Sequence, residues 1–485
     1  DVRNSSRIKG LSMSESPLAS RYASPEMLAL FSPHYKYTTW RKLWISLAKA
    51  QRDLGLPISV EQILEMEQKI EEFSWDRIAS YEKKLCHDVM AHIHAFGDVA
   101  PLAKGIIHLG ATSCYVTDNT DLIQMKEALT LLQAKLLGAI SHFSSLAKQY
   151  ADLPCLSYTH LQAAQPTTIG KRICLWIQDF LMDFETLVQT THELRFLGLK
   201  GATGTQASFL ALFDGNTSKV QELEEKIAKA MGFSRIIPIS GQTYTRKQDV
   251  RIFQALSNIA ISCHKFATDL RLLAHMKEME ESFHKDQVGS SAMPYKRNPT
   301  RSERLCGLSR YLLSLQDNPT YTAATQWLER SLDDSANRRV SIPEAFLCAD
   351  AVLNLLYHLS SHLVIYPKMI EQRVLEELPF LATENIIMAA SQKGKNRQEL
   401  HEALRKKCQR LSDQWKLEGE KGDLFQEIAE DPLFALSKEE LQRILNPSHF
   451  IGRAPEQVKE FLLKEIDPVL QKYAFLKTPT IRVEI

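Results

Sequence analysis

The sequence predicts an all-α protein built around a bundle of long helices. Glycine and proline number only 19 each in 485 residues, so few residues are available to interrupt regular structure. Apolar residues recur in steps of three and four over runs of about seven turns, much longer than an average helix. No stretch of comparable length alternates with a period of two, so any strands are expected to be short.

Three apolar stripes define the expected central helices, which fall at 117–150, 166–197 and 247–281. Each stripe follows nearly a seven-residue repeat, which is typical of helices that cross at shallow angles. We therefore expect these helices to pack along their lengths. The stripes consist of Leu122, Met125, Leu129, Leu132, Leu136, Ile140, Phe143 and Leu146, then Ile169, Ile173, Trp176, Phe180, Phe184, Leu187 and Leu194, then Ile252, Leu256, Ile259, Cys263, Phe266, Leu270 and Leu273.

The polar segments between the helices divide the chain into three helical domains. We expect an N-terminal domain at 1–112, a central long-helix bundle at 113–364 that carries an unusual loop, and a C-terminal domain at 365–485. Helices this long have apolar flanks that few neighbours in one chain can cover. The leftover stripes predict a homo-oligomer that shares its bundle, and coverage by the two smaller domains is the alternative.

The charge and the cysteine content argue against several classes of protein. The formal net charge of +1 favours neither nucleic acid nor an anionic membrane as a partner. Eight cysteines without a CxxC pair argue against zinc-ribbon and thioredoxin-like proteins and indicate a reducing compartment. Residues 1–16 lack the apolar core of a secretory signal, and 345–366 is too polar to cross a bilayer comfortably. We expect a soluble, cytoplasmic protein.

The segment 289–299 is the most unusual passage in the chain. It reads Gly-Ser-Ser-Ala-Met-Pro-Tyr-Lys-Arg-Asn-Pro, so small residues make its start mobile and two prolines stiffen its end. A serine hydroxyl is a poor base unless its alkoxide is stabilised. Lys296 and backbone N–H groups can supply that stabilisation or hold a carboxylate. Composition alone leaves open a solvated Gly/Ser connector with incidental charges.

The same segment matches the signature Gly-Ser-Ser-x-Met-Pro-x-Lys-x-Asn-Pro of the fumarase/aspartase superfamily at every fixed position. Within that superfamily the chain resembles the adenylosuccinate lyase family at 87–92 (His-Asp-Val-Met-Ala-His), 107–113 (Ile-His-Leu-Gly-Ala-Thr-Ser) and 332–339 (Leu-Asp-Asp-Ser-Ala-Asn-Arg-Arg). The resemblance extends from about residue 17 into the C-terminal domain. It implies a bundle shared in a homotetramer, active sites assembled from three subunits, and no cofactor or metal.

The resemblance also implies an enzyme of purine nucleotide biosynthesis. Such a lyase releases fumarate by β-elimination from adenylosuccinate, giving AMP, and from the succinylaminoimidazole carboxamide ribotide, giving the aminoimidazole carboxamide ribotide. This chemistry requires a base, an acid and cations that stabilise a carbanion. The alternatives are another superfamily lyase, such as argininosuccinate lyase, and a structural homologue in which catalysis has lapsed.

Five residues are expected to be catalytic on the same resemblance. Ser290 is expected to remove the proton. His160 is expected to protonate the leaving nitrogen, a role that suits an imidazole because its charge changes near neutral pH. His87 is expected to support His160 or to bind the phosphate, and which histidine donates the proton stays open. Lys296 is expected to hold the succinyl carboxylate, and Glu303 to orient a partner.

Substrate contacts are expected from several separated segments, because the nucleotide carries two carboxylates and a phosphate. Arginine suits such groups, since its planar fork matches carboxylate and phosphate geometry. For any single arginine on a long helix, a solvated surface pair is the alternative. The expected contacts are Arg21, Tyr22, His87, Asp88, Thr112, Ser113, Gln242, Arg304, Arg330, Ser335 and Arg339.

Two of these motifs have structural alternatives. His160 could instead cap the helix that is expected to begin near Pro166, because proline suits the first turn of a helix. The pair Asp333-Asp334 resembles an acid/base or metal pair, but we expect it to cap the following helix and to orient the arginines that come after it.

Three histidines near the N-terminal domain boundary raise the question of a metal site. His87, His92 and His94 do not have the spacing of metal ligands on one helix. The role of His108 stays open. Cys86 stands where animal members of the family carry arginine, so a nucleotide contact from that side chain is in doubt.

Overall fold

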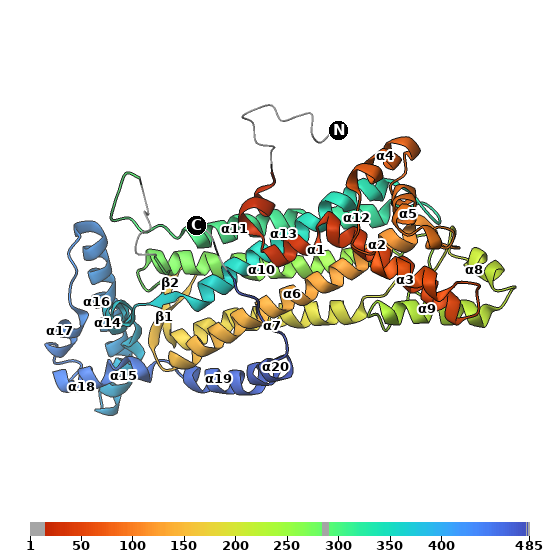
Figure 1. Ribbon diagram of the computed structural model, residues 1–485. Helices are drawn as coiled ribbons and strands as arrows, with labels where there is room; N and C mark the ends of the chain where they lie inside the picture. The colour runs from red at the N-terminus through yellow and green to blue at the C-terminus, as the bar shows by residue number, and fades with distance from the viewer. Residues whose placement is uncertain (1–14, 284–290, 482, 484–485) are drawn as a thin grey trace.

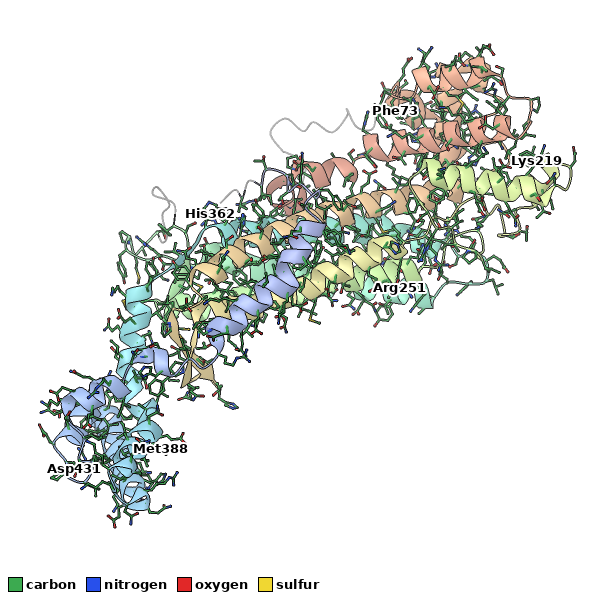
Figure 2. The ribbon with its side chains drawn as sticks, turned by 90° about the horizontal axis from the view of Figure 1, so that it is seen from below. Phe73, Lys219, Arg251, His362, Met388 and Asp431 are labelled. Atoms are coloured by element: carbon green, nitrogen blue, oxygen red, sulfur yellow. The ribbon has the colours of Figure 1, made fainter. Side chains whose placement is uncertain are left out.

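The computed structural model describes residues 15–283, 291–481 and 483. It is an elongated molecule in which a long helical bundle carries short helices at one end and a compact helical group at the other (Figure 1). Figure 2 shows the same shape from below, with Phe73 and Lys219 at one extremity and Met388 and Asp431 at the other. The prediction of an all-α fold is confirmed.

Four long helices form the bundle, and the three predicted apolar stripes lie along the first three of them, buried except for the partly buried Leu146. Phe143, Trp176, Phe180 and Phe266 pack across these three helices with ring centroids between 5.0 and 6.2 Å apart. Such aromatic contacts add to the free energy gained by burying apolar surface. The four helices are α6 (Ser113–Gln149), α7 (Ile169–Glu193), α10 (Lys247–His275) and α13 (Asp333–Ser361).

The helix α13 also has the length and apolar composition of a membrane span, with a mean hydropathy of 1.4 in its most apolar window. However, 78% of that window is buried inside the molecule. It packs against α6, α10 and α11 as a core helix of the bundle.

The N-terminal helices pack against the bundle, most of them at the end where α6 and α13 begin. Their apolar residues join those of the bundle in one continuous hydrophobic cluster. Ser59 and Gln62 form a capping box at the start of α3, which satisfies N–H groups that the first helical turn leaves without partners. These elements are η1 (Leu18–Tyr22), α1 (Pro25–Leu30), α2 (Pro33–Asp53), α3 (Val60–Gln68), α4 (Trp75–Leu85), α5 (Asp88–Val99) and η2 (Pro101–Ala103).

Shorter elements connect the long helices. The described strands pair as two antiparallel ribbons, β1 with β2 and β3 with β4. The connecting elements are β1 (Pro154–Thr159), β2 (Gln162–Thr168), α8 (Ala207–Leu212), α9 (Thr217–Ala230), β3 (Met279–Glu281), α11 (Thr300–Ser314), α12 (Asp317–Ala324) and β4 (Leu363–Ile365).

Four predicted helix ends were wrong by three residues or more. The first helix begins at Ser113 rather than at 117 and the second ends at Glu193 rather than at 197, and the other two errors fall next to strands. The second helix begins at Ile169, because Pro166 lies within β2 and Thr168 accepts the N–H of Lys171 at 3.2 Å as the cap. The third helix ends at His275, and Lys277 then has a left-handed φ of +60° before β3 begins. Both ends pass into ribbons that the apolar spacing did not predict.

One glycine sets how closely α6 and α7 approach. A Cβ atom at Gly170 would lie 2.5 Å from the carbonyl oxygen of Ala147 and 2.7 Å from the Cα of Ala151. The start of α7 therefore contacts the end of α6 through backbone atoms. Any side chain at this position would push the two helices apart.

The C-terminal part of the chain leaves the bundle and then returns to it. A second hydrophobic cluster runs from Leu378 to Phe450, whereas Val458, Leu462 and Ile466 belong to the bundle cluster. The predicted boundaries after 112 and 364 stay predictions. The elements are α14 (Pro367–Leu381), α15 (Thr383–Gln392), α16 (Arg397–Glu418), α17 (Leu424–Ala429), α18 (Lys438–Ile444), η3 (Pro447–His449), α19 (Ala454–Phe461), η4 (Leu462–Ile466) and α20 (Asp467–Lys472).

Candidate active site

A pocket of about 970 Å³ opens where the N-terminal helices meet the first turns of α6 and α13. Its size is in the range of small-molecule binding sites. Its walls also include residues between α4 and α5 and residues that precede α10. The predicted site residues that line it are His87, Asp88, Ser113, Gln242, Arg330, Ser335 and Arg339.

His87 lies at the rim of this pocket as the N-cap residue of α5. Its Nδ1 accepts the backbone N–H of Met90 at 3.3 Å, and its Nε2 lies 3.4 Å from the hydroxyl oxygen of Ser113. A nitrogen that accepts a hydrogen bond carries no proton, so the proton of a neutral His87 is assigned to Nε2. The hydrogen bond that caps α5 therefore directs the Nε2–H group of His87 toward the Ser113 hydroxyl.

The first turns of α13 place a hydroxyl and a guanidinium on one helix face. Ser335 and Arg339 are four residues apart, so their side chains lie one above the other. Arg339 donates from Nη2 to Asp88 Oδ2 at 2.8 Å, and its side chain is 60% exposed. Asp88 itself lies in the first turn of α5. The pair links α5 to α13 across the mouth of the pocket.

The long helix α6 points its N-terminus at the pocket. Thr112 is the N-cap residue with extended backbone, and its side chain makes no cap hydrogen bond. Ser113 lines the pocket, whereas Thr112 lies beside it. The unpaired N–H groups and the dipole of a helix start favour a negatively charged ligand.

Buried carboxylates hold the pocket arginines in place. Asp334 is 2% exposed and accepts hydrogen bonds from Arg246 Nε at 2.8 Å and from Arg330 Nη1 at 3.1 Å. Arg246 also donates to Asp118 Oδ2 at 2.9 Å. We expected Asp333-Asp334 to orient the arginines that follow it, and this was wrong. Asp334 instead binds Arg330, which precedes α13, and Arg246, at the start of α10.

A second arginine extends this network. Arg338 Nε donates to Asp249 Oδ2 at 2.8 Å, and Arg338 Nη1 lies 3.0 Å from Asp121. Burial alone would lower the pKa of Arg338, but Asp249 and the neighbouring carboxylates raise it well above its usual value. Arg246 and Arg338 were missed in the sequence, because their partners lie far away along the chain and follow no spacing rule.

Gln242 joins the pocket to a glycine-rich loop. Its Nε2 donates to the carbonyl oxygen of Ala202 at 3.1 Å, and its Oε1 accepts the thiol of Cys114 at 3.5 Å. Gly204 has a φ of +87°, and a Cβ there would lie 1.9 Å from the carbonyl oxygen of Ser240. The loop is therefore packed tightly against the residues that precede Gln242.

His108 lies behind the pocket and has a structural partner. Its Nδ1 accepts the indole N–H of Trp44 at 2.8 Å. Burial, and to a smaller extent the charge of His87, lower the pKa of His108 to about 4. His108 is therefore a neutral acceptor that supports α2 against the segment before α6.

Acidification should destabilise the protein through this group. Between pH 6.5 and about 4 the unfolded His108 binds a proton that the folded one excludes, so the free energy of unfolding falls as pH falls, by up to about 1.4 kcal/mol per pH unit. A His108→Gln variant keeps an acceptor for Trp44 and should flatten this slope in urea unfolding. His449→Gln at an exposed position is the control, and an unchanged slope in His108→Gln would assign the effect to another group.

A second group of predicted residues lies on the side of the bundle. Tyr22 ends η1, and the guanidinium of Arg304, from α11, lies 5.4 Å from the centre of its ring. Arg21 lies 5.9 Å from the same ring. These three residues and Asn354 line a narrow recess, separate from the pocket around His87.

His160 lies at the tip of the β1–β2 hairpin. His160 and Leu161 have left-handed φ angles of +54° and +56°, and they connect Thr159 to its strand partner Gln162. This is the geometry of a two-residue hairpin turn. The alternative in which His160 caps the next helix was wrong, because β2 separates it from α7. The imidazole is exposed to solvent.

Residues 291–299, which precede α11, lie at the same end of the molecule as this hairpin (Figure 1). Lys296 is exposed, and its backbone N–H donates to the carbonyl oxygen of Met293 at 3.1 Å. Glu303, in the first turn of α11, lies 3.9 Å from Arg271 and lines a pocket of about 490 Å³. Ser290 lies outside the described residues.

Within one chain the pocket around His87 does not meet the hairpin that carries His160. The 37 residues of α6 make it roughly 55 Å long, and this helix separates Ser113 from the hairpin that carries His160. The 29 residues of α10 span roughly 43 Å between Arg246 and the loop region. Figure 1 shows β1 and β2 at the opposite end of the bundle from α4 and α5.

Two further expectations concern metal and thiol chemistry. Across residues 15–283 and 291–481, no cluster of three or more His, Cys, Asp or Glu side chains has an arrangement that could hold a metal ion. Cys86 is exposed, lines the pocket and ends α4 with a left-handed φ of +51°. A thiol there offers the pocket no charge.

Family models match most of the chain. A model described as lyase matches residues 23–312, and one described as the adenylosuccinate lyase C-terminus matches 379–461. The chain is 50% identical to adenylosuccinate lyase of Saccharomyces cerevisiae, over 94% of this chain and 95% of the yeast protein. It is 49% identical to that of Schistosoma mansoni, over 94% of this chain and 96% of the relative.

Solved structures share the fold at lower identity. The 3-carboxy-cis,cis-muconate lactonizing enzyme from Pseudomonas putida has a TM-score of 0.81 at 23% identity, over 95% of this chain and 100% of that one. Fumarate lyase from Mesorhizobium sp. BNC1 has a TM-score of 0.76 at 20% identity, over 92% and 99%. The family models and the sequence relatives together show that the chain is a lyase of the fumarase/aspartase superfamily and belongs to the adenylosuccinate lyase family.

Proposed function

We propose that this enzyme releases fumarate from adenylosuccinate, giving AMP, and from the succinylaminoimidazole carboxamide ribotide, giving the aminoimidazole carboxamide ribotide. Family membership supports the reaction. The observation that carries the nucleotide assignment is the pocket in which Arg330, Ser335 and Arg339 meet the start of α6. A phosphate suits this setting, because guanidinium groups and helix N–H groups bind it through charge-assisted hydrogen bonds.

The proposed chemistry divides between the two ends of the bundle. Ser290 removes the proton next to the succinyl carboxylate, and Lys296 stabilises the negative charge that develops. His160 protonates the leaving nitrogen, so that the carbon–nitrogen bond breaks and fumarate leaves. His87 binds the nucleotide or supports His160 from the pocket end, and Glu303 orients a neighbouring cation.

We further propose a cytoplasmic homotetramer in which each site draws on more than one subunit. The separation of His87 from His160 along α6 supports shared sites. Large apolar side chains also stay exposed on the bundle helices, namely Leu175, Met182, Ile261 and Leu272, which is typical of surfaces that pack against another subunit. All eight cysteines are free, in keeping with a reducing compartment.

The test of the activity is fumarate release by the purified protein, followed by ultraviolet absorbance. Adenylosuccinate and the succinylaminoimidazole carboxamide ribotide should both be cleaved, and argininosuccinate should not. Cleavage of argininosuccinate alone would favour the sister enzyme, and no cleavage of any of the three would favour a lapsed homologue. Light scattering of the same sample measures the oligomeric state.

Replacing Arg339 by alanine should weaken the binding of a phosphorylated substrate. A charge-assisted hydrogen bond contributes about 1.5–3 kcal/mol, so KM is expected to rise about 10- to 100-fold with a smaller change in kcat. Arg251→Ala is the matched control, because Arg251 (Figure 2) is similarly exposed and paired, with Glu193, outside the pocket. An unchanged KM in Arg339→Ala would count against the nucleotide assignment.

A further inference from the structure

Lys135 of α6 and Asp350 of α13 form an ion pair inside the bundle, and both side chains are 0% exposed. Removing two ions from water costs several kcal/mol each, and apolar residues of similar volume often replace such a pair without loss of stability. The need to stabilise the contact between α6 and α13 therefore does not by itself explain why a charged pair lies there.

The pair belongs to a hydrogen-bond network in which each charge is fully satisfied. Lys135 Nζ donates to Asp350 Oδ1, to Asn354 Oδ1 at 2.8 Å and to Ser24 Oγ at 3.0 Å. An ammonium group has three donors, and all three are used. Asp350 Oδ2 accepts the backbone N–H of Ser24 at 2.6 Å and the amide of Asn354 at 3.1 Å. A satisfied buried network fixes one arrangement of its members.

One member of the network, Ser24, comes from the N-terminal segment rather than from the bundle. It is held through both its backbone N–H and its hydroxyl. Asn354 also donates to the carbonyl oxygen of Tyr22 at 3.5 Å. Ser24 in turn caps α1 by accepting the N–H of Met27 at 3.4 Å. The network therefore anchors the backbone from Tyr22 to Ser24.

The anchored residues carry part of the candidate substrate site. The guanidinium groups of Arg21 and Arg304 lie 5.9 and 5.4 Å from the Tyr22 ring centre, within reach of cation–π attraction. The position of the Tyr22 backbone therefore sets where the ring lies between the two guanidinium groups. The buried network reaches this backbone through Asn354, which donates to the Tyr22 carbonyl oxygen and lines the same recess.

We infer that the network of Lys135, Asp350 and Asn354 is a positioning device for substrate binding. It fixes Tyr22, and with it Arg21 opposite Arg304, before the substrate arrives. The inference rests on the proposed function. Lys135 and Asp350 are fully buried, and Asn354 is only 4% exposed at the wall of the recess. The ion pair therefore acts through the N-terminal segment, and preorganisation of this kind lowers KM without changing the chemical step.

The main test replaces the whole network by apolar residues, as Lys135→Met/Asp350→Leu/Asn354→Leu. Complete replacement avoids an unpaired buried charge, so the variant should keep its fold and melting temperature. Its KM for adenylosuccinate should rise at least about tenfold while kcat changes little. Gln133→Leu/Thr191→Val is the control, since it removes a part-buried hydrogen bond of 2.7 Å between α6 and α7, and it should leave KM unchanged.

A second pair of variants breaks the anchor and leaves the ion pair intact. Ser24 has φ −73° and ψ 153°, and Ala23 before it is extended, so Ser24→Pro fits the backbone and removes both the N–H and the hydroxyl. Ser24→Ala removes only the hydroxyl. We expect KM to rise in Ser24→Pro and to rise less in Ser24→Ala.

Hydrogen exchange gives a result that does not depend on activity. Amides at 18–24 should exchange faster in the triple variant and in Ser24→Pro than in the unmodified protein and the Gln133/Thr191 control. Unchanged exchange, or an unchanged KM in a folded triple variant, would overturn the inference. If the unmodified protein does not cleave adenylosuccinate, the proposed function fails, and faster exchange alone then shows an anchor without a role in binding.

Discussion

Mixing a His87→Ala chain with a His160→Ala chain should restore activity that neither variant has alone. His87 and His160 lie at opposite ends of α6, a helix of 37 residues, so a single chain cannot bring both to one substrate. If each site takes the two histidines from different subunits, random mixing in a tetramer makes about a quarter of the sites intact. The specific activity should approach about a quarter of that of the unmodified enzyme.

The experiment requires co-expression or subunit exchange, followed by the fumarate assay. The control mixes His87→Ala with Arg330→Ala, whose altered residues line the same pocket of one chain. The activity of this mixture should not exceed the sum of the activities of the two separate variants, because no chain then supplies an intact pocket. Equal activity in both mixtures, or none in the first, would contradict shared sites.

A Ser290→Ala variant should lose nearly all turnover. Without the base, the proton next to the carboxylate has no acceptor, and removal of a general base lowers kcat by about a hundred- to ten-thousandfold. KM should change far less, since the expected binding contacts come from other residues. Steady-state kinetics with a folding check by circular dichroism makes the measurement.

The neighbouring serine is the matched control for that variant. Ser291 is exposed, and Ser291→Ala makes the same chemical change one residue away. We expect it to keep most of its turnover. A folded Ser290→Ala enzyme with full turnover would refute the assignment of the base and leave the family membership intact.

The long helices were predictable because their physics is local. Apolar residues that repeat along one face, such as Leu122 and Phe143 in α6, are buried as the spacing required. The β1–β2 hairpin was not predictable in the same way. Its turn uses His160 and Leu161 at positive φ, where the usual signal is Asn-Gly, and Pro166 within β2 resembled a helix start.

The candidate site was predictable only where a motif carried it. The signature loop and its companion segments pointed to the residues around His87 and Arg339, and seven of them line one pocket. The supporting network was hidden, because Arg246 and Asp118 lie 128 positions apart and charged residues on long helices are usually solvated. Burial, which turns those pairs into anchors, is a property of the folded chain.

The C-terminal cluster from Leu378 to Phe450 is, in topological terms, an insertion between two passes of the same scaffold. The polypeptide departs through α14 and comes back through α19, and Thr478 still donates to the carbonyl oxygen of Ala134 on α6 at 2.9 Å. A premature stop codon in this region would therefore strip covering segments from the bundle as well as the appendage. An in-frame excision that rejoined the two passes would spare them.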